Sequence, residues 1–203
     1  MLVALKPLHD TFCVKHINVC TYQAVSGSGK DGVEELLQQS SAYIDQRSID
    51  KKVYPKQIAF NSIPFVDCFL ENNYTREEMK MVWETHKILD KNISVNPTAV
   101  RVPVLVGHAE SIYIETEKEI DIELAKNCLN EFAGISVIDD VQQVDFPTSY
   151  EHGHGTDDVY VGRIRKGLNK NNSLNLWVVA DNVRKGAALN SIQIAENLVG
   201  SKM

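Results

Sequence analysis

Residues 21–30, Thr-Tyr-Gln-Ala-Val-Ser-Gly-Ser-Gly-Lys (TYQAVSGSGK), join an extended segment to a segment with helical periodicity. Two glycines and a lysine at such a junction are similar to a phosphate-binding loop, whose pattern is Gly-x-x-x-x-Gly-Lys-Ser/Thr. Here Ala24 stands where the first glycine would be and Asp31 follows Lys30, which excludes a nucleoside-triphosphate loop. Free backbone N–H groups at the start of a helix still suit an anion, and a connector that binds nothing fits the pattern as well.

Outward from this junction, the hydrophobic pattern divides the chain into strands and helices. The pattern predicts strands at residues 12–22, 98–106, 110–117, 135–139, 158–166 and 173–181. It predicts helices at 30–44, 76–90, 121–132 and 182–198, and a helical end at 2–9 in which Pro7 is unfavourable. Because helices do not alternate strictly with strands, we expect an α+β fold with a mixed, mostly antiparallel sheet and helices on one face.

Two local signals refine this pattern. Thr75 followed by Glu78 is a capping-box signature and predicts that a helix begins at residue 76. Residues 45–65 are polar and contain two prolines, which indicates a long irregular connection. The dinucleotide fingerprint Gly-x-Gly-x-x-Gly does not occur in the sequence.

Composition excludes several classes of protein. The 203 residues carry a net charge of −6, whereas a nucleic-acid surface requires a basic face. No apolar run approaches the roughly 20 residues of a membrane-spanning helix. The four cysteines are far apart and form no Cys-x-x-Cys pair, which indicates reduced thiols and a cytoplasmic location rather than disulfides or a zinc site.

Five segments, in order along the chain, resemble aspartate-semialdehyde dehydrogenases. They are TYQAVSGSGK (21–30), MVWETHKIL (81–89), AVRVPVLVGHAES (99–111), DDVYVGRIRK (157–166) and LNLWVVADNVRKGAALNSIQIAE (174–196). The resemblance implies an NADP-dependent homodimer that converts 4-aspartyl phosphate to aspartate 4-semialdehyde in lysine, methionine and threonine biosynthesis. It implies a C-terminal domain like that of glyceraldehyde-3-phosphate dehydrogenase.

The resemblance also implies which part of the enzyme these residues represent. Residues 1–203 correspond to the substrate-binding and dimerisation domain, and the helix at 182–199 corresponds to the one that packs on a nucleotide-binding domain absent from this chain. The nucleophilic cysteine precedes the matching region in the family. We therefore expect the chain alone to lack dehydrogenase activity and not to bind NADP tightly.

The resemblance assigns the reaction itself to three residues. Gln23 matches the glutamine that orients the thioester intermediate. Arg101 matches the arginine that binds the substrate α-carboxylate, a contact suited to a planar guanidinium. His108 matches the general acid/base. Arg101 and His108 differ in parity, so one straight strand containing both would point them to opposite faces, and a break at Gly107 is expected.

The resemblance assigns substrate and cofactor contacts to five further residues. Glu84 and Lys87 match a Glu-Thr-x-Lys segment whose glutamate meets the substrate amino group and whose lysine helps to hold phosphate. A surface ion pair is the alternative interpretation of this pair. Ser26 and Gly27 resemble a loop near the nicotinamide and phosphate of NADP, and Asn182 resembles an asparagine near the nicotinamide amide.

Several alternatives remain open from the sequence. The chain could be a non-catalytic dimeric module, or part of a related acyl-phosphate reductase such as N-acetyl-glutamyl-phosphate reductase. The sequence leaves NADP and NAD undecided, because the residues that would contact the ribose phosphate are not present. His152, His154 and Asp157 could bind a metal, but a loop without a metal is the favoured interpretation, and no metal is expected.

Overall fold

The computed structural model describes residues 1–200, which form a six-stranded sheet in the order β2-β1-β3-β6-β5-β4. The strands are β1 Val14–Gln23, β2 Ser94–Arg101, β3 His108–Thr116, β4 Ile135–Val137, β5 Val159–Lys166 and β6 Ser173–Ala180. The pairs β1–β3, β3–β6 and β6–β5 are antiparallel, whereas β1–β2 and β4–β5 are parallel. The predicted mixed, mostly antiparallel sheet is confirmed.

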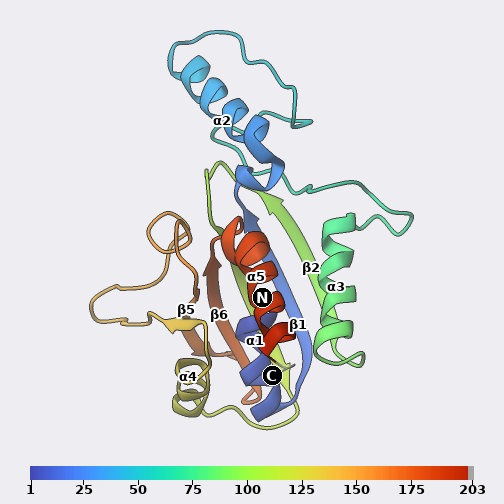
Figure 1. The fold of residues 1–203 in the computed structure, drawn as a ribbon, viewed down its shortest axis with the longest axis vertical. Helices are drawn as coiled ribbons and strands as arrows, with labels where there is room; N and C mark the ends of the chain where they lie inside the picture. The colour runs from blue at the N-terminus through green and yellow to red at the C-terminus, as the bar shows by residue number, and fades with distance from the viewer. Residues whose placement is uncertain (201–203) are drawn as a thin grey trace.

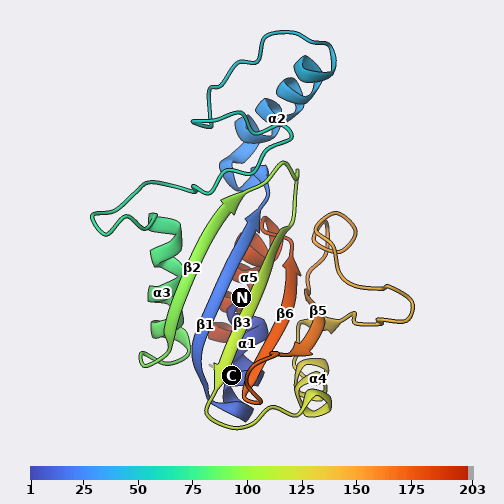
Figure 2. The same cartoon turned by 180° about the vertical axis from the view of Figure 1, so that it is seen from behind.

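The helices are α1 Leu2–Phe12, α2 Gly29–Ile44, α3 Arg76–Ile88, α4 Ile122–Asn130 and α5 Leu189–Gly200. The helices other than α2, which projects beyond the upper end of the sheet, gather on one face of this sheet. In Figure 1, α1 and α5 lie in front of the central strands and α3 flanks β2. Figure 2 shows the opposite face of the sheet with no helix in front of it. The expectation of helices on one face is therefore confirmed.

The core lies between α1 and the covered face of the sheet. Strand side chains alternate between the two faces, and those in the middle of the covered face are apolar, whereas polar residues such as Gln23 and His108 lie toward the strand ends. They pack with α1 residues in one cluster that includes Leu5, Leu8, Phe12, Ile17, Val19, Ile112, Ile114, Leu174, Leu176 and Val178. Complete burial of each such side chain contributes about 1.5–3 kcal/mol. This cluster holds the strand ends in place at the top of the sheet.

The first helix is longer than the sequence predicts, because it continues through Pro7 to Phe12. Proline lacks only its own N–H, so one helical hydrogen bond is lost while the rest of the helix remains. Burial of Leu8 and Phe12 in the core offsets that loss. At the other end of the chain, the helix predicted from residue 182 begins with a π-helical turn, Arg184–Ala188, before α5.

The strand predicted at 98–106 is displaced, since β2 begins at Ser94 and ends at Arg101. Pro103 has no N–H for a sheet ladder, so the Val-x-Val alternation beyond Arg101 is not a strand signal here. The chain instead turns, and the carbonyls of Val104 and Leu105 accept hydrogen bonds from the N–H groups of Val25 and Ser26. The prediction that this strand continues to residue 106 was therefore wrong.

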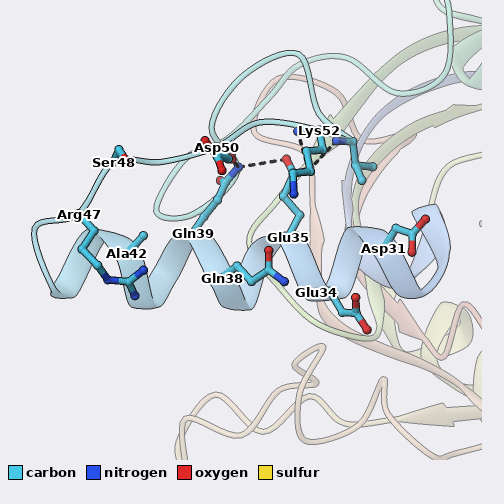
Figure 3. A pocket seen from close by; sticks show the side chains of 11 residues that line it. Asp31, Glu34, Glu35, Gln38, Gln39, Ala42, Arg47, Ser48, Asp50 and Lys52 are labelled. Carbon is cyan, nitrogen blue, oxygen red and sulfur yellow. Dashed lines mark hydrogen bonds between the residues drawn. The ribbon is translucent and has the colours of Figure 1, made fainter.

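An arm made of α2 and residues 45–65 projects beyond the upper end of the sheet (Figure 1). Residues 45–65 contain no helix or named strand, as predicted. The arm has a small core of its own, comprising Val25, Leu36, Tyr54, Ile58, Ala59 and Ile63. Figure 3 shows Glu35 and Gln39 pointing from α2 toward the returning loop. Their side chains accept hydrogen bonds from backbone N–H groups at residues 52–54 and 58–59, which fixes the loop on the helix.

The predicted capping box at the start of α3 is present. The Thr75 hydroxyl accepts from Glu78 N–H at 3.2 Å, and the Glu78 carboxylate accepts from Thr75 N–H at 2.7 Å. The other oxygen of Glu78 accepts from Ala99 N–H of β2 at 3.0 Å. This buried carboxylate therefore sets the position of α3 along β2.

Among residues 1–200, no helix combines the length and the apolar character needed to cross a membrane.

Candidate active site

The ends of four strands meet at the top of the sheet, on the face that the helices cover. The sheet register pairs Gln23 of β1 with Arg101 of β2, and His108 of β3 with Ala180 of β6. Since β1 and β3 are neighbours, Gln23, Arg101 and His108 lie on adjacent strands at one end of the sheet. Residues far apart in sequence are thus brought together by the register alone.

The side chains of Arg101 and His108 both lie beside Gly27. A Cβ added to Gly27 would lie 2.9 Å from Arg101 Nη1 and 3.5 Å from His108 Nε2. The expected break between the two residues is present, because β2 ends at Arg101 and Gly107 has a φ of +90°. Glycine is needed there because other residues rarely adopt that conformation. The break turns both side chains into one cavity.

The main chain of Ala24 orients both of these side chains. Its carbonyl accepts a hydrogen bond from Arg101 Nη1 at 2.6 Å, and its N–H donates to His108 Nδ1 at 3.1 Å. Because Nδ1 acts as an acceptor, the neutral imidazole of His108 carries its hydrogen on Nε2. That nitrogen is directed past Gly27 into the cavity.

Burial and neighbouring charges shift the pKa values of His108 and Arg101. Burial, followed by the positive charge of Arg101, lowers the pKa of His108 from 6.5 to about 4. His108 is therefore neutral at physiological pH. Burial also lowers the pKa of the Arg101 guanidinium, against the opposing influence of Tyr54 and Glu77. A guanidinium nevertheless keeps its charge, so a buried cation is available to bind an anionic group.

Gln23 connects this pair to α3. Its amide nitrogen donates to Glu77 Oε1 at 3.1 Å, and Glu77 forms an ion pair with Lys80 at 2.9 Å. Burial would raise the pKa of Glu77, but the hydrogen bonds from Lys80 and Gln23 outweigh it and lower that pKa. The Glu77–Lys80 pair faces the cavity together with Gln23, Arg101 and His108.

The sequence predicted a role for a different Glu-x-x-Lys pair on α3, namely Glu84 and Lys87. Glu84 and Lys87 are both exposed, and of the two only Glu84 lines the cavity. Glu77 and Lys80 have the same spacing two turns earlier, beside Gln23. The structure thus brings Glu77 and Lys80 to the cavity, although sequence reasoning did not name them. The repeated spacing was the only signal that could have found them.

The predicted cofactor residues form another wall of the cavity. The Asn182 side chain accepts from Ser26 Oγ at 3.2 Å and from Gly107 N–H at 3.0 Å, and thereby joins three chain segments. Gly27 and Asn182 line the cavity, whereas Ser26 lies behind them. Gly27 packs closely against Arg101, since an added Cβ would lie 2.9 Å from Arg101 Nη1, and Asn182 Nδ2 carries a second hydrogen beyond its contact with Ser26. An amide donor such as Asn182 Nδ2 is chemically suited to the amide oxygen of a nicotinamide.

The cavity has a volume of about 740 Å³ and opens between the N-terminus of α1, α3 and the start of the last helix. Its cations are Arg101, Lys80 and Lys185, and its anions include Glu77, Glu84 and Asp181. Such an arrangement suits a small zwitterion with an additional anionic group. It brings a guanidinium, a carboxylate, an ammonium and an imidazole donor around one space.

A separate cavity of about 510 Å³ lies between α2 and the loop at 47–53 (Figure 3). Its buried polar groups are engaged within the chain, since Glu35 accepts from the N–H groups of Lys52 and Val53 and from Gln39. The two cavities have no lining residue in common. Its polar side chains hold the arm together.

The histidine-rich loop supports the site from behind. His152 Nδ1 accepts from Thr148 N–H, and its ring packs against Tyr160 at 5.3 Å between centroids. Asp157 forms an ion pair with Arg184 at 2.6 Å. Within residues 1–200, no group of three or more His, Cys, Asp or Glu side chains is arranged to hold a metal. The loop packs its backbone at Gly153 against Gly107.

The chain is similar to known dehydrogenases over almost its entire length. It is 55% identical over 200 residues to the aspartate-semialdehyde dehydrogenase of Shewanella violacea, covering 98% of this chain and 59% of that protein. It is 50% identical to the enzyme of Legionella pneumophila, covering 98% of this chain and 57% of that protein. This chain thus spans less than two thirds of the length of these curated relatives.

Solved structures agree with the sequence comparison. A crystal structure of aspartate semialdehyde dehydrogenase II from Vibrio cholerae, complexed with ASA, matches with a TM-score of 0.96 and 50% identity. The match covers 100% of this chain and 60% of that one. The family model for the semialdehyde dehydrogenase dimerisation domain matches residues 5–185. The chain therefore belongs to the semialdehyde dehydrogenase family, of which it contains the dimerisation domain.

Proposed function

We propose that this chain is the substrate-binding and dimerisation part of an NADP-dependent aspartate-semialdehyde dehydrogenase. The complete protein would reduce 4-aspartyl phosphate to aspartate 4-semialdehyde, for lysine, methionine and threonine biosynthesis in the cytoplasm. The observation that carries the proposal is the meeting of Arg101, His108 and the Glu77–Lys80 pair in one cavity. These groups are complementary to the carboxylate, carbonyl, amine and phosphate of that substrate.

Each polar group of the substrate has a partner in this arrangement. Arg101, fixed by the carbonyl of Ala24, binds the α-carboxylate through its remaining N–H groups. Glu77, kept ionised by Lys80 and Gln23, receives the α-ammonium group. Lys80 contributes positive charge to the phosphate, and Glu77 rather than the predicted Glu84 meets the amino group, with Glu84 lining the same cavity. A substrate held by both ends presents its reacting carbon in a defined orientation.

The reacting carbonyl lies next to His108 in this proposal. The Nε2 hydrogen of His108 points to the carbonyl oxygen, and Gln23 orients the thioester from the other side. We expect a cysteine thiol from outside these 203 residues to form that thioester. A bound nicotinamide would supply the hydride, and Gly27 and Asn182 would contact its ring, with Ser26 holding the Asn182 side chain from behind.

The bare face of the sheet is the proposed homodimer surface. Tyr22 and Trp177 lie on it with ring centroids 5.3 Å apart, and Tyr113 shares the face. Aromatic side chains of this kind are enriched at protein interfaces. We propose further that α5, in which no residue is buried, packs on the nucleotide-binding domain of the complete protein.

The test compares two aldehydes with the complete protein. NADPH formation is measured in the presence of phosphate with aspartate 4-semialdehyde and, separately, with N-acetyl-glutamate semialdehyde. We expect activity with the first and little with the second, because the acetylated amine can form no ion pair with Glu77. A preference for the acetylated substrate would overturn the proposal in favour of the related reductase, and no activity with either would favour a non-catalytic dimer.

A matched pair of variants tests the substrate contact. Arg101→Lys removes the planar fork and should raise KM for the semialdehyde about tenfold to a hundredfold. Arg47→Lys makes the same exchange in an ion pair on the arm, away from the cavity, and should leave KM unchanged. Equal KM values for the two variants would contradict the role of Arg101.

A further inference from the structure

We propose that the arm positions Arg101 for substrate binding, through the phenol of Tyr54 and through the buried carboxylate of Glu35 that holds Tyr54 in place. The proposal rests on the proposed function, because it concerns the residue that binds the substrate α-carboxylate. Neither Tyr54 nor Glu35 lines the active-site cavity. Both act through other residues and are therefore positioning residues.

The main chain of Arg101 is held from both sides. β2 is the edge strand of the sheet, and on its inner side Arg101 pairs with Gln23 of β1. On its outer side, Ile63 N–H donates to the Arg101 carbonyl at 2.9 Å, and Arg101 N–H donates to the Ile63 carbonyl at 2.8 Å. Ile63 belongs to the small core of the arm. The arm therefore fixes the backbone from which the Arg101 side chain extends.

The guanidinium of Arg101 depends on the arm as well. Nη1 donates to the carbonyl of Ala24 at 2.6 Å, and the next residue, Val25, is fully buried in the core of the arm. The Tyr54 hydroxyl donates to the carbonyl of Val25 at 3.4 Å. Tyr54 is also close enough to Arg101 to oppose the lowering of the Arg101 pKa by burial. The phenol thus supports the segment that orients the guanidinium.

The space around the Tyr54 hydroxyl is filled. Tyr54 is buried, and a Cβ added to Gly32 of α2 would lie 2.7 Å from the hydroxyl oxygen. The same Cβ would lie 2.8 Å from the carbonyl oxygen of Val25. Because protein interiors are close-packed, the ring has no room to move to another position, and its hydroxyl stays beside the Val25 carbonyl.

Glu35 determines where the backbone of Tyr54 lies. Its Oε2 accepts from the N–H groups of Lys52 and Val53 at 2.9 and 2.5 Å, and its Oε1 accepts from Tyr54 N–H at 3.4 Å. Gln39 Nε2 also donates to Oε1, at 3.0 Å. A buried carboxylate is costly unless hydrogen bonds replace its hydration, and here backbone N–H groups do so. The loss of one acceptor oxygen would therefore release the segment that carries Tyr54.

Support of this kind matters for an arginine that binds a carboxylate. A bidentate contact uses two N–H groups of one plane, and a plane that is already oriented loses less freedom on binding. The contact of Nη1 with the Ala24 carbonyl sets that plane for Arg101. A shift of the Ala24–Val25 segment would turn the plane and misalign the N–H groups that remain. The arm thus contributes to substrate affinity, although none of its residues lines the cavity.

Steady-state kinetics of the complete protein test the role of Tyr54. Tyr54→Phe removes only the hydroxyl and should raise KM for aspartate 4-semialdehyde about threefold to tenfold, with little change in kcat or in KM for phosphate. Tyr43→Phe makes the same exchange at an exposed position of the arm and should leave every constant unchanged. An unaltered KM in Tyr54→Phe, or an equal rise in KM for phosphate, would overturn the proposal.

A double-mutant cycle shows whether Tyr54 acts through Arg101. Arg101→Lys removes the planar fork, so nothing remains for the phenol to orient. Adding Tyr54→Phe to Arg101→Lys should therefore raise KM for the semialdehyde no further. Effects of the two substitutions that multiply in the double variant would contradict a role of Tyr54 through Arg101.

A matched pair on α2 tests the role of Glu35. Glu35→Gln replaces one acceptor oxygen by an amide donor and should raise KM for the semialdehyde about tenfold. Glu34→Gln makes the same exchange in a surface ion pair with Lys30 and should leave KM unchanged. Equal KM values for the two variants would refute the role of Glu35. If circular dichroism shows that Glu35→Gln does not fold, Tyr54→Phe, which keeps every hydrogen bond of Glu35, decides the proposal.

NMR of the complete protein labelled with nitrogen-15 arginine reports on the guanidinium without any turnover. The Arg101 Nε–H signal is assigned by its loss in Arg101→Lys. We expect this signal to shift in Tyr54→Phe and to stay in place in Tyr43→Phe. An Arg101 signal that does not respond to Tyr54→Phe would refute the positioning role. Absence of semialdehyde oxidation by the unaltered complete protein would refute the proposed function instead, and the NMR result would stand independently.

Discussion

The contact between Gly107 and the histidine-rich loop leads to a quantitative prediction. A Cβ at Gly107 would lie 2.5 Å from the carbonyl oxygen of Ser149 and 2.6 Å from that of Gly153. Both obstacles are backbone atoms, so a rotamer change cannot relieve them. Gly107→Ala therefore combines the cost of a positive φ, about 1–2 kcal/mol, with an overpacking cost of about 1–3 kcal/mol. The expected loss is about 2–5 kcal/mol.

Gly155→Ala separates these two contributions. Gly155 has a similar φ of +75°, but an added Cβ would meet no atom within 4 Å. Only the conformational cost of about 1–2 kcal/mol remains. Thermal unfolding of the two variants, followed by circular dichroism, should differ by about 4–8 °C for a packing cost near 2 kcal/mol. Equal melting temperatures would refute the claim that the loop backbone fills the space beside Gly107.

Three further predictions concern other parts of the chain. Gly32→Ala should destabilise by about 1–3 kcal/mol, because its Cβ would lie 2.8 Å from the carbonyl oxygen of Val25, while Gly186→Ala, in open space, should be neutral or slightly stabilising in the same denaturation assay. Thr75→Ala should cost about 1–2 kcal/mol in urea unfolding through loss of the cap on α3, and an unchanged midpoint would contradict that cap. The pKa of His108 is about 4 in the folded protein and 6.5 in the unfolded chain, so between these pH values the unfolded chain binds one more proton than the folded protein. The free energy of unfolding should therefore fall by up to about 3 kcal/mol as the pH drops from 6.5 to 4. His108→Gln should flatten that part of the stability–pH curve, and a variant with the same slope would assign the slope to other groups.

The sequence predicted much of the fold because its signals were local. The capping box at Thr75 and the alternation in β1 and β6 depend on neighbouring residues, and the structure agrees with both. Valines at 100, 102, 104 and 106 show the same alternation, yet β2 ends at Arg101 and does not continue through the last three. There the decisive facts are the missing N–H of Pro103 and the hydrogen bonds to residues 25–26. Those partners are distant in sequence, so periodicity alone could not identify the end of the strand.

The candidate site was predictable to the same extent. The meeting of Arg101 and His108 followed from a break at Gly107, which the sequence indicated. The Glu-x-x-Lys spacing occurs twice in α3, and both copies lie on similar faces of the helix. Only the position of Gln23, bonded to Glu77, decides which copy meets the cavity. That choice depends on how α3 sits along β2, a tertiary relation fixed by the buried Glu78 carboxylate.

The N–H group of Ala24 has a consequence for genetics. Every encoded amino acid except proline has the same backbone N–H donor at this position. The effects seen in a mutational screen of residue 24 would therefore reflect the size of the new side chain at a buried position, and they would not reveal the hydrogen bond to His108. Proline would fit the φ of −64° but would remove the donor and push its ring toward the imidazole. Substitutions can therefore affect this hydrogen bond only by moving the backbone at residue 24. Removing the N–H alone requires chemical synthesis, because no encoded residue other than proline lacks it.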